Sequence, residues 1–411
     1  MSELSYLEKL LDGAEVEWVA LNKLATFLKG KSLPKEKITP DGNRYCIHYG
    51  ELFTHYGPII DKVCSKTNQA INESILSEKN DVLMPTSDVT PRGLATASCI
   101  QESGVILGGD ILIIRCSGVD GRYLSNFIIN NKKKILQMVK GSTVYHLYAK
   151  DIGKLLIPIP CPNNPEKSLA IQSEIVRILD KFTALTAELT AELTAELTAR
   201  KKQYNYYRDQ LLSFDENEVE WKALGEIAAY SKSRISFDKL DENNYVGVDN
   251  LLQNRAGKMQ SNYVPTSGNL TEFREGDILI GNIRPYLKKI WQADSTGGTN
   301  GDVLVIRSCH ESILPRYLYQ ILADENFFEY NMQHAKGAKM PRGNKDAIMK
   351  YRLPIPSLNE QTRIVSVLDK FDTLTNSISE GLPREIELRQ KQYEYYRDLL
   401  FSFPKPDSVT N

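Results

Sequence analysis

Apolar residues recur three or four positions apart through residues 168–214. They are Ile171, Ile175, Ile178, Leu179, Phe182, Leu185, Leu189, Leu193 and Leu197. Within this stretch the tetrapeptide TAEL occurs three times without interruption, over 186–189, 190–193 and 194–197. Ala, Glu and Leu favour helices, and leucines four residues apart share one helix face. The pattern predicts one helix over 168–214, roughly 70 Å long at about 1.5 Å per residue.

The sequence also repeats itself. EVEWVALNKLA at 15–25 returns as EVEWKALGEIA at 218–228, and KQYNYYRDQLLSF at 202–214 returns as KQYEYYRDLLFSF at 391–403. Helical blocks of matching length suit two helices packed side by side, and a pseudo-twofold relation between the copies makes them antiparallel. We therefore predict an antiparallel coiled coil. The alternative is two helices, each buried in its own domain.

The second helical block keeps apolar residues where the first has its regularly spaced leucines. They are Leu374, Ile378, Leu382 and Ile386. Pro383 stands where the first block has Thr194. Because proline lacks a backbone N–H and its ring clashes with the preceding turn, we expect the second helix to kink or break there.

The two variable segments have the pattern of short strands. ILGGDILIIR and REGDILIGN are apolar runs entered through Gly-Asp turns, and helix-like apolar stretches follow at 123–129 and 317–322. The predicted fold class is α+β, with two mixed, mostly β domains joined by two long helices. The predicted domain boundaries are 1–156 and 215–352 for the variable domains, and 157–214 and 353–411 for the helical blocks.

Charge is distributed unevenly, although the whole chain of 411 residues carries a net charge of only −1. Residues 26–150 hold 16 basic and 11 acidic residues, and residues 229–352 hold 17 and 14. The rest of the chain is acidic. Two basic lobes on an acidic frame favour a protein that contacts a polyanion through both lobes and protein elsewhere.

Sequence signatures of catalysis are missing. No Gly-rich dinucleotide turn, zinc-binding helix or nucleophile elbow occurs, and Asn164-Pro165-Glu166 is the nearest approach to an amino-methyltransferase motif. We expect no catalytic residue and no metal site. The six cysteines are widely spaced and no apolar run reaches 18 residues, which predicts reduced thiols in a cytoplasmic protein without a membrane span.

Taken together, these features resemble the specificity subunit of type I restriction–modification systems. The matching features are two variable segments, two related helical blocks, the IPIP and LPIP entries at 157–160 and 353–356, and the YYRD motif that closes each block. The uninterrupted TAEL array is similar to that of the type IC group. The resemblance covers essentially the whole chain.

The resemblance implies a non-catalytic subunit that supplies the address for an enzyme complex. Each variable domain would read one half of a bipartite DNA target, and the helices would dock two methyltransferase subunits. Restriction and motor subunits would join through that core. S-adenosylmethionine, ATP and Mg would bind to partner subunits, and none of them to this chain. The competing interpretations are a coiled-coil adaptor that does not bind DNA and a self-contained methyltransferase or nuclease.

Candidate DNA contacts are polar and basic residues on turns, because base edges and phosphates are bound by such side chains. In the first segment they are Ser87, Thr90, Arg92, Lys140, Ser142, Thr143, Tyr145 and His146. In the second they are Asn282, Arg284, Tyr286, Lys288, Lys289, Lys336, Lys339, Arg342, Asn344 and Lys345. Arg284 and Arg342 rank first, since arginine pairs bidentately with guanine. For each residue the alternative is a solvated charge or a turn residue.

Candidate partner contacts are the aromatic and arginine side chains that close each helical block, because such residues are enriched at protein interfaces. They are Tyr204, Tyr207, Arg208, Tyr393, Tyr396 and Arg397. The alternative is that these tyrosines seal the coiled coil onto the neighbouring domain.

The TAEL array also predicts how the two lobes are spaced. Four residues advance a helix by roughly 6 Å and rotate it by about 400°, which is about 40° beyond a full turn. One DNA base pair advances about 3.4 Å and turns roughly 35°. We therefore hypothesise that the number of TAEL units sets the gap between the half-sites.

Overall fold

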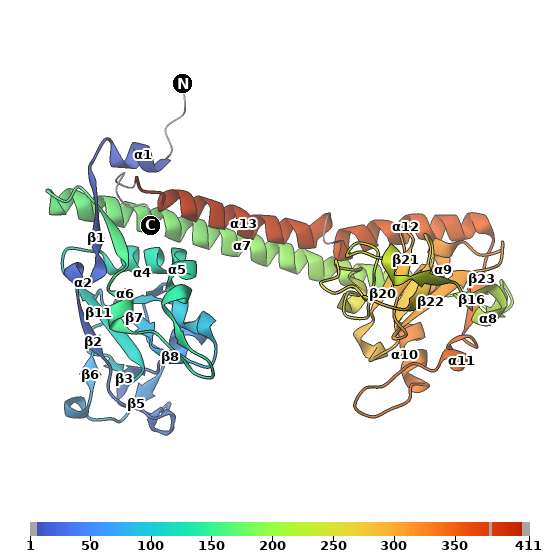
Figure 1. Cartoon of the computed structure of the whole chain (residues 1–411), viewed down its shortest axis with the longest axis horizontal. Helices are drawn as coiled ribbons and strands as arrows, with labels where there is room; N and C mark the ends of the chain where they lie inside the picture. Colours follow the sequence, from blue (N-terminus) through green and yellow to red (C-terminus); the bar gives the residue numbers. More distant parts are fainter. Residues whose placement is uncertain (1–5, 378–379, 405–411) are drawn as a thin grey trace. The chain divides into compact units, whose positions relative to one another are not determined.

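The computed structural model describes residues 6–377 and 380–404, which divide into two compact units (Figure 1). The first unit combines Met1–Ala187 with Gln390–Asn411, and the second unit is the continuous stretch Glu188–Arg389. The first unit is therefore built from both ends of the chain.

The central sheet of the first unit has five strands in the order β2-β11-β7-β9-β4. They are β2 (Ala25–Lys29), β11 (Ile111–Cys116), β7 (Val82–Pro85), β9 (Ser98–Ile100) and β4 (Ile59–Ile60). The Ile111–Ile114 run of β11 is completely buried, because α4 (Gly121–Asn130) contacts β7 and β9 and a second apolar cluster lies on the other side of the sheet. A central strand buried on both faces reads as a continuous apolar run, as this one does.

Smaller elements complete the first unit. A four-stranded sheet contains β5 (Lys66–Thr67), β3 (Arg44–Ile47), β10 (Ile106–Leu107) and β6 (Ile75–Leu76), and a two-stranded sheet pairs β1 (Val16–Ala20) with β14 (Leu156–Pro160). A three-stranded sheet contains β12 (Lys140–Gly141), β13 (Tyr145–His146) and β8 (Ser87–Asp88). The remaining helices are α1 (Tyr6–Leu11), α2 (Leu21–Leu24), α3 (Glu51–Thr54), α5 (Lys132–Met138) and α6 (Ala149–Ile152).

The second unit follows the same plan. Its main sheet has the order β16-β22-β19-β20, with β16 (Ala228–Tyr230), β22 (Val303–Ser308), β19 (Ile278–Gly281) and β20 (Ile290–Gln292). Beside it lie β17 (Arg234–Ser236), β18 (Asn269–Phe273) and β21 (Gly297–Thr299), and the pair β15 (Glu220–Ala223) and β23 (Arg352–Ile355). The helices are α8 (Leu224–Ile227), α9 (Pro315–Leu322), α10 (Glu325–Gln333) and α11 (Lys345–Ile348).

Matching interactions show that the repeat in the sequence is a repeat of the fold. In the first unit Arg115 pairs with the buried Asp81 at 2.7 Å, and in the second Arg307 pairs with the buried Asp277 at 2.6 Å. The hydroxyl of Tyr123 donates to the carbonyl of Pro158. The hydroxyl of its counterpart Tyr317 donates to the carbonyl of Pro354. Buried polar pairs therefore recur at the same places in both units.

Three long helices carry the constant blocks. They are α7 (Pro165–Leu212), α12 (Leu358–Asn376) and α13 (Gly381–Leu400). The predicted first helix is confirmed, and Leu189, Leu193 and Leu197 are half-buried along it while the residues around them are mostly exposed. The second helix is interrupted before Pro383, which sits in the first turn of α13, where its missing N–H costs least. Ile378 lies outside the described residues.

The α+β fold class is confirmed by two mostly β units with long helices. In the first unit α7 and the end of α13 run antiparallel, since Phe182 stacks on Tyr396 and Thr183 bonds to Tyr393. The predicted boundary at residue 156 falls inside β14, and the one at residue 352 falls at the start of β23. The first residues assigned to each helical block therefore belong to a sheet. The domain boundaries as a whole remain a prediction.

Candidate nucleic-acid and partner interfaces

The predicted DNA contacts of the first unit are brought together by the small sheet of β8, β12 and β13. His146 pairs with both Ser87 and Lys140, and Tyr145 pairs with Asp88 and Gly141. Segments more than fifty residues apart thus form one surface. Ser142 and Thr143 are exposed in the turn between β12 and β13, and Tyr145 and His146 are half-buried.

A turn beside this sheet carries the other predicted contacts. The hydroxyl of Thr90 donates to a side-chain oxygen of Asp88 at 2.8 Å. This hydroxyl therefore cannot donate to DNA while that bond is kept. Arg92 is exposed at the start of the 3-10 turn Pro91–Ala95. Lys140 lies 3.4 Å from Asp151 but remains 62% exposed. Arg92 and Lys140 are therefore exposed cations that this surface can offer to a polyanion.

The second unit assembles the corresponding loops in the same way. Arg342 pairs with both Ile283 and Lys336 across the two loops. The backbone N–H of Arg284 donates to the carbonyl of Pro341 at 2.7 Å. The two segments singled out in the sequence, 282–289 and 336–345, are therefore one structural element.

The exposed side chains of this element include its two leading arginines. Arg284 is exposed and adopts a left-handed backbone conformation with φ of 53°. Arg342 is exposed and is oriented by an ion pair of 2.8 Å with Asp302. Tyr286, Lys336, Lys339 and Lys345 are also exposed. Together these side chains offer cationic and hydrogen-bonding groups to a DNA groove.

Four predicted contacts are buried or bonded within the second unit instead. Asn282 is buried, and Lys289 donates to the carbonyl of Val248 at 2.7 Å. Lys288 bonds to Glu325 at 2.5 Å. Asn344 caps α11 by accepting from the N–H groups of Asp346 and Ala347. The side chains of Lys288, Lys289 and Asn344 are therefore engaged inside the unit, and the buried Asn282 presents little surface to DNA.

Other residues of this element were missed in the sequence because only the fold brings them into place. Asp302 orients Arg342 from a different strand connection. Gly343 leaves room for two buried amides, since a Cβ there would lie 2.5 Å from Asn331 and 2.8 Å from Asn282. Isolated acidic, amide and glycine residues give no signal along the chain.

Two predicted partner contacts are corrected by their burial. Tyr204 and Arg208 are 2% and 1% exposed, and both contact Gln320 of α9. They pack the end of α7 against α9 within the second unit and present almost no surface to a partner. This agrees with the alternative that these side chains seal the helix onto the neighbouring domain. In the first unit Arg397 likewise donates to Asn130 at 2.8 Å.

Tyr207 and Tyr396 remain available to a partner. Tyr207 is 39% exposed and stacks on Phe371, and Tyr396 is 37% exposed and stacks on Phe182. Tyr393 is half-buried and bonds to Thr183.

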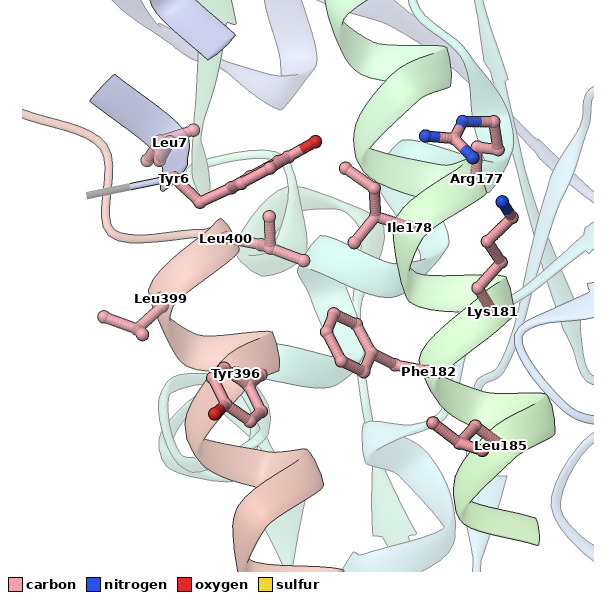
Figure 2. Close-up of a pocket in the computed structure, with 10 residues that line it drawn as sticks. All are labelled: Tyr6, Leu7, Arg177, Ile178, Lys181, Phe182, Leu185, Tyr396, Leu399 and Leu400. Atoms are coloured by element: carbon pink, nitrogen blue, oxygen red, sulfur yellow. The ribbon is translucent and has the colours of Figure 1, made fainter. Parts of the chain in front are cut away.

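Tyr396 lines an apolar groove of about 520 Å³ in the first unit, between α1, α7 and α13 (Figure 2). Figure 2 shows that Arg177 and Lys181 are the cationic side chains of its lining. The other lining residues are Tyr6, Leu7, Ile178, Phe182, Leu185, Leu399 and Leu400. This groove is an apolar feature of the helical surface that a partner could fill.

Metal-ligating side chains do not cluster in the described part of the chain. No group of three His, Cys, Asp or Glu residues among residues 6–377 and 380–404 could hold a metal ion. Burial raises the pKa of the Cys46 thiol to about 11 and that of Cys99 to about 12, so both are held as thiols rather than as nucleophilic thiolates. None of the described helices combines the length and apolar character needed to cross a membrane.

A family model for the type I restriction modification DNA specificity domain matches residues 14–199 and 216–388, so that one copy falls on each half of the duplication. The chain belongs to this family. The type I restriction enzyme EcoR124I/EcoR124II specificity subunit of Escherichia coli is 37% identical, with all of both chains covered. The EcoprrI specificity subunit, also from Escherichia coli, is 34% identical over 92% of this chain and 93% of its own.

Solved structures agree on the fold of this specificity subunit. A chain from a study of complex assembly and conformational transition of the type I restriction–modification system matches with a TM-score of 0.61 at 16% identity, over 94% of this chain and 97% of the other. The HsdS subunit from Thermoanaerobacter tengcongensis matches with a TM-score of 0.50 at 14% identity, over 94% and 95%.

Proposed function

We propose that this specificity subunit reads a bipartite, gapped DNA target, with one half-site bound by each unit. The observation that carries the proposal is that both units build a paired-loop surface from the same topological positions and expose cations on it. Phosphate contacts by these cations would position the subunit, and Arg284 and Arg342 would read base edges in the second half-site.

The helices are proposed to dock two methyltransferase subunits and to set the gap between half-sites. Exposed Tyr207 and Tyr396, and the apolar groove beside Tyr396, support a protein contact at the helix ends. Restriction and motor subunits would join through this core. The chain itself would be non-catalytic and act in the cytoplasm, with S-adenosylmethionine, ATP and Mg bound by its partners.

The test is to map methylated adenines. The chain is expressed with the methyltransferase subunit of its own system in a host that lacks other adenine methylation, and modified positions are sequenced. A single gapped, asymmetric motif methylated on both strands is expected. A double variant, Arg92→Ala with Arg342→Ala, removes one proposed DNA contact from each unit. It should reduce methylation without preventing assembly.

Two other outcomes would redirect the proposal. A stable complex with an active partner but no methylation would favour a coiled-coil adaptor that does not bind DNA. Methylation by the chain alone, with S-adenosylmethionine but no partner, would favour a self-contained methyltransferase.

A further inference from the structure

A buried polar cluster lies in the second unit where α7 ends against the junction of α9 and α10. The carbonyl of Ala323, just after α9, accepts hydrogen bonds from two arginines. Arg255 donates from Nη1 at 2.8 Å, and Arg208 of α7 donates from Nη1 at 3.3 Å. Arg208 is 1% exposed. One carbonyl oxygen therefore joins a long helix to a loop that lies far from it in the sequence.

The position of this carbonyl explains why it attracts two cations. The last carbonyls of a helix have no partner within the helix and carry the negative end of its dipole. Burial lowers the pKa of Arg255, and the nearby charge of Arg208 lowers it further. Glu325 offsets this cost, since its carboxylate lies 3.3 Å from the Arg255 guanidinium. Arg208, Arg255 and Glu325 therefore form one connected set of contacts around the end of α9.

The same cluster is attached to the turn that carries candidate base readers. The backbone N–H of Arg255 donates to the carbonyl of Lys288 at 3.0 Å, and the ammonium of Lys288 bonds to Glu325 at 2.5 Å. Lys288 directly follows the 3-10 turn Pro285–Leu287, which displays the exposed Tyr286. Backbone and side chain of Lys288 are thus both fixed by the cluster.

Left-handed backbone conformations are concentrated in the two turns that contain Arg255 and Lys288. Seven non-glycine residues in the described part of the chain have positive φ, and four of them are Asn254, Arg255, Arg284 and Lys288. Non-glycine residues rarely occupy this region, and where they do the surrounding structure holds them there at a conformational cost. The two turns that touch through Arg255 and Lys288 are therefore held in strained shapes.

We infer that Arg255 is a positioning residue for recognition of the second half-site. It fixes the turn that carries Arg284 and Tyr286 to the end of α9 and to the buried Arg208 of α7, through Ala323 and Glu325. The inference rests on the proposed function. The first unit uses a different contact, because Arg397, the counterpart of Arg208, donates to Asn130. Because Arg255 belongs to the second unit, its effect should be confined to the second half-site.

The test measures DNA affinity of the complex assembled with the methyltransferase subunits. Three DNA duplexes are compared: one with both half-sites intact, one with the first scrambled and one with the second scrambled. Arg255→Ala should lower the preference for the intact second half-site by about tenfold, or about 1.4 kcal/mol, and leave the preference for the first unchanged. Arg255→Lys keeps the charge near Glu325 and should recover part of the preference.

Arg234→Ala is the matched control, since Arg234 is an exposed arginine of the same unit whose side chain bonds to Thr271. Its preference for both half-sites should match that of the wild type. If Arg255→Ala does not assemble, Arg255→Lys and Glu325→Gln carry the test, and each should lower the second preference alone.

Three results separate the possibilities. Loss of preference for the second half-site alone supports the inference. An assembled Arg255→Ala complex that keeps this preference, or that loses both preferences equally, overturns the inference while the proposed function stands. A wild-type complex without preference for either half-site overturns the proposed function itself.

Discussion

Arg397 donates a hydrogen bond of 2.8 Å to the side-chain oxygen of Asn130, although 267 positions separate the two residues. The bond joins the last helix of the chain to the end of α4. Close by, Phe401 and Phe403 lie against Tyr123, with ring centroids 5.8 and 6.3 Å apart. The core of the first unit is therefore completed by the C-terminal segment.

A double-mutant cycle tests the bond between Arg397 and Asn130. Arg397→Met and Asn130→Ala should each lower the free energy of unfolding by about 1–3 kcal/mol, because each leaves a polar partner without its bond. Coupling of about 0.5–3 kcal/mol between the two changes is expected, because the residues are in direct contact. Urea unfolding measures both, with Tyr395→Phe on the exposed face of α13 as the control. Purely additive effects would show that the bond does not form in solution.

Deleting residues 190–193 tests the spacer. Removal of one TAEL unit shortens α7 by roughly 6 Å while keeping its apolar face in register to within about 40°. The methylated motif should keep both half-sites and lose one base pair from its gap. A variant with Glu192→Gln keeps the length of the helix and should keep the gap. An unchanged gap in the deletion variant contradicts the hypothesis.

Arg342→Ala tests base reading in the second unit. Loss of one bidentate contact should cost about 1–3 kcal/mol of discrimination at one position of the second half-site. Asp302→Asn should have a smaller effect in the same direction, since Asp302 orients Arg342 through their ion pair. Competition binding with single-base variants measures the discrimination, and Lys350→Ala removes an exposed charge as the control. An equal loss of affinity for all sequences would mean that Arg342 contacts phosphate rather than a base.

The ion pairs of Glu325 predict a dependence on pH. Burial alone would raise the pKa of Glu325, but the hydrogen bond from Lys288 and the charges of Arg255, Lys288 and Arg208 lower it below its ordinary 4.5. Because the folded pKa is depressed, the stabilisation is present above about 4.5 and is lost as the pH falls through the folded value.

Glu325→Gln should therefore unfold at a lower temperature than the wild type at pH 7. The difference between the two unfolding temperatures should shrink as the pH falls below 4.5. Glu329→Gln, an exposed change on the same helix, is the control. A difference that stays constant over this pH range would show that the ion pairs do not stabilise the fold.

The repeated helices and strands could be predicted from the sequence because their signal is local. The leucines of the TAEL array fix the face of α7, and the apolar run of β11 fixes a buried strand. The break in the second helix was also expected from Pro383, although the helix is interrupted a few residues earlier. Gly381, with φ of 79°, lies at this point and adopts a conformation that glycine favours.

The internal roles of polar residues could not be predicted, because they depend on contacts between distant segments. Arg208 looks like a surface arginine in the sequence, yet its partners Gln320 and Ala323 lie more than a hundred residues away and bury it. Lys288 looks like a DNA contact in the sequence, yet its ammonium forms an ion pair with Glu325. Arginine and lysine carry no local mark that separates a buried partner from a free cation.

The return of the last helix to the first unit also fixes the order in which a ribosome can complete the molecule. All residues of Glu188–Arg389 leave the ribosome before the segment from Gln390 onward, which the first unit needs. Domains generally fold as units during synthesis. The unit that is translated first is therefore finished last, and a chain that stops before Phe401 leaves Tyr123 and Phe127 without the aromatic rings that cover them. Premature termination would thus expose an apolar surface in the half of the protein that is already made.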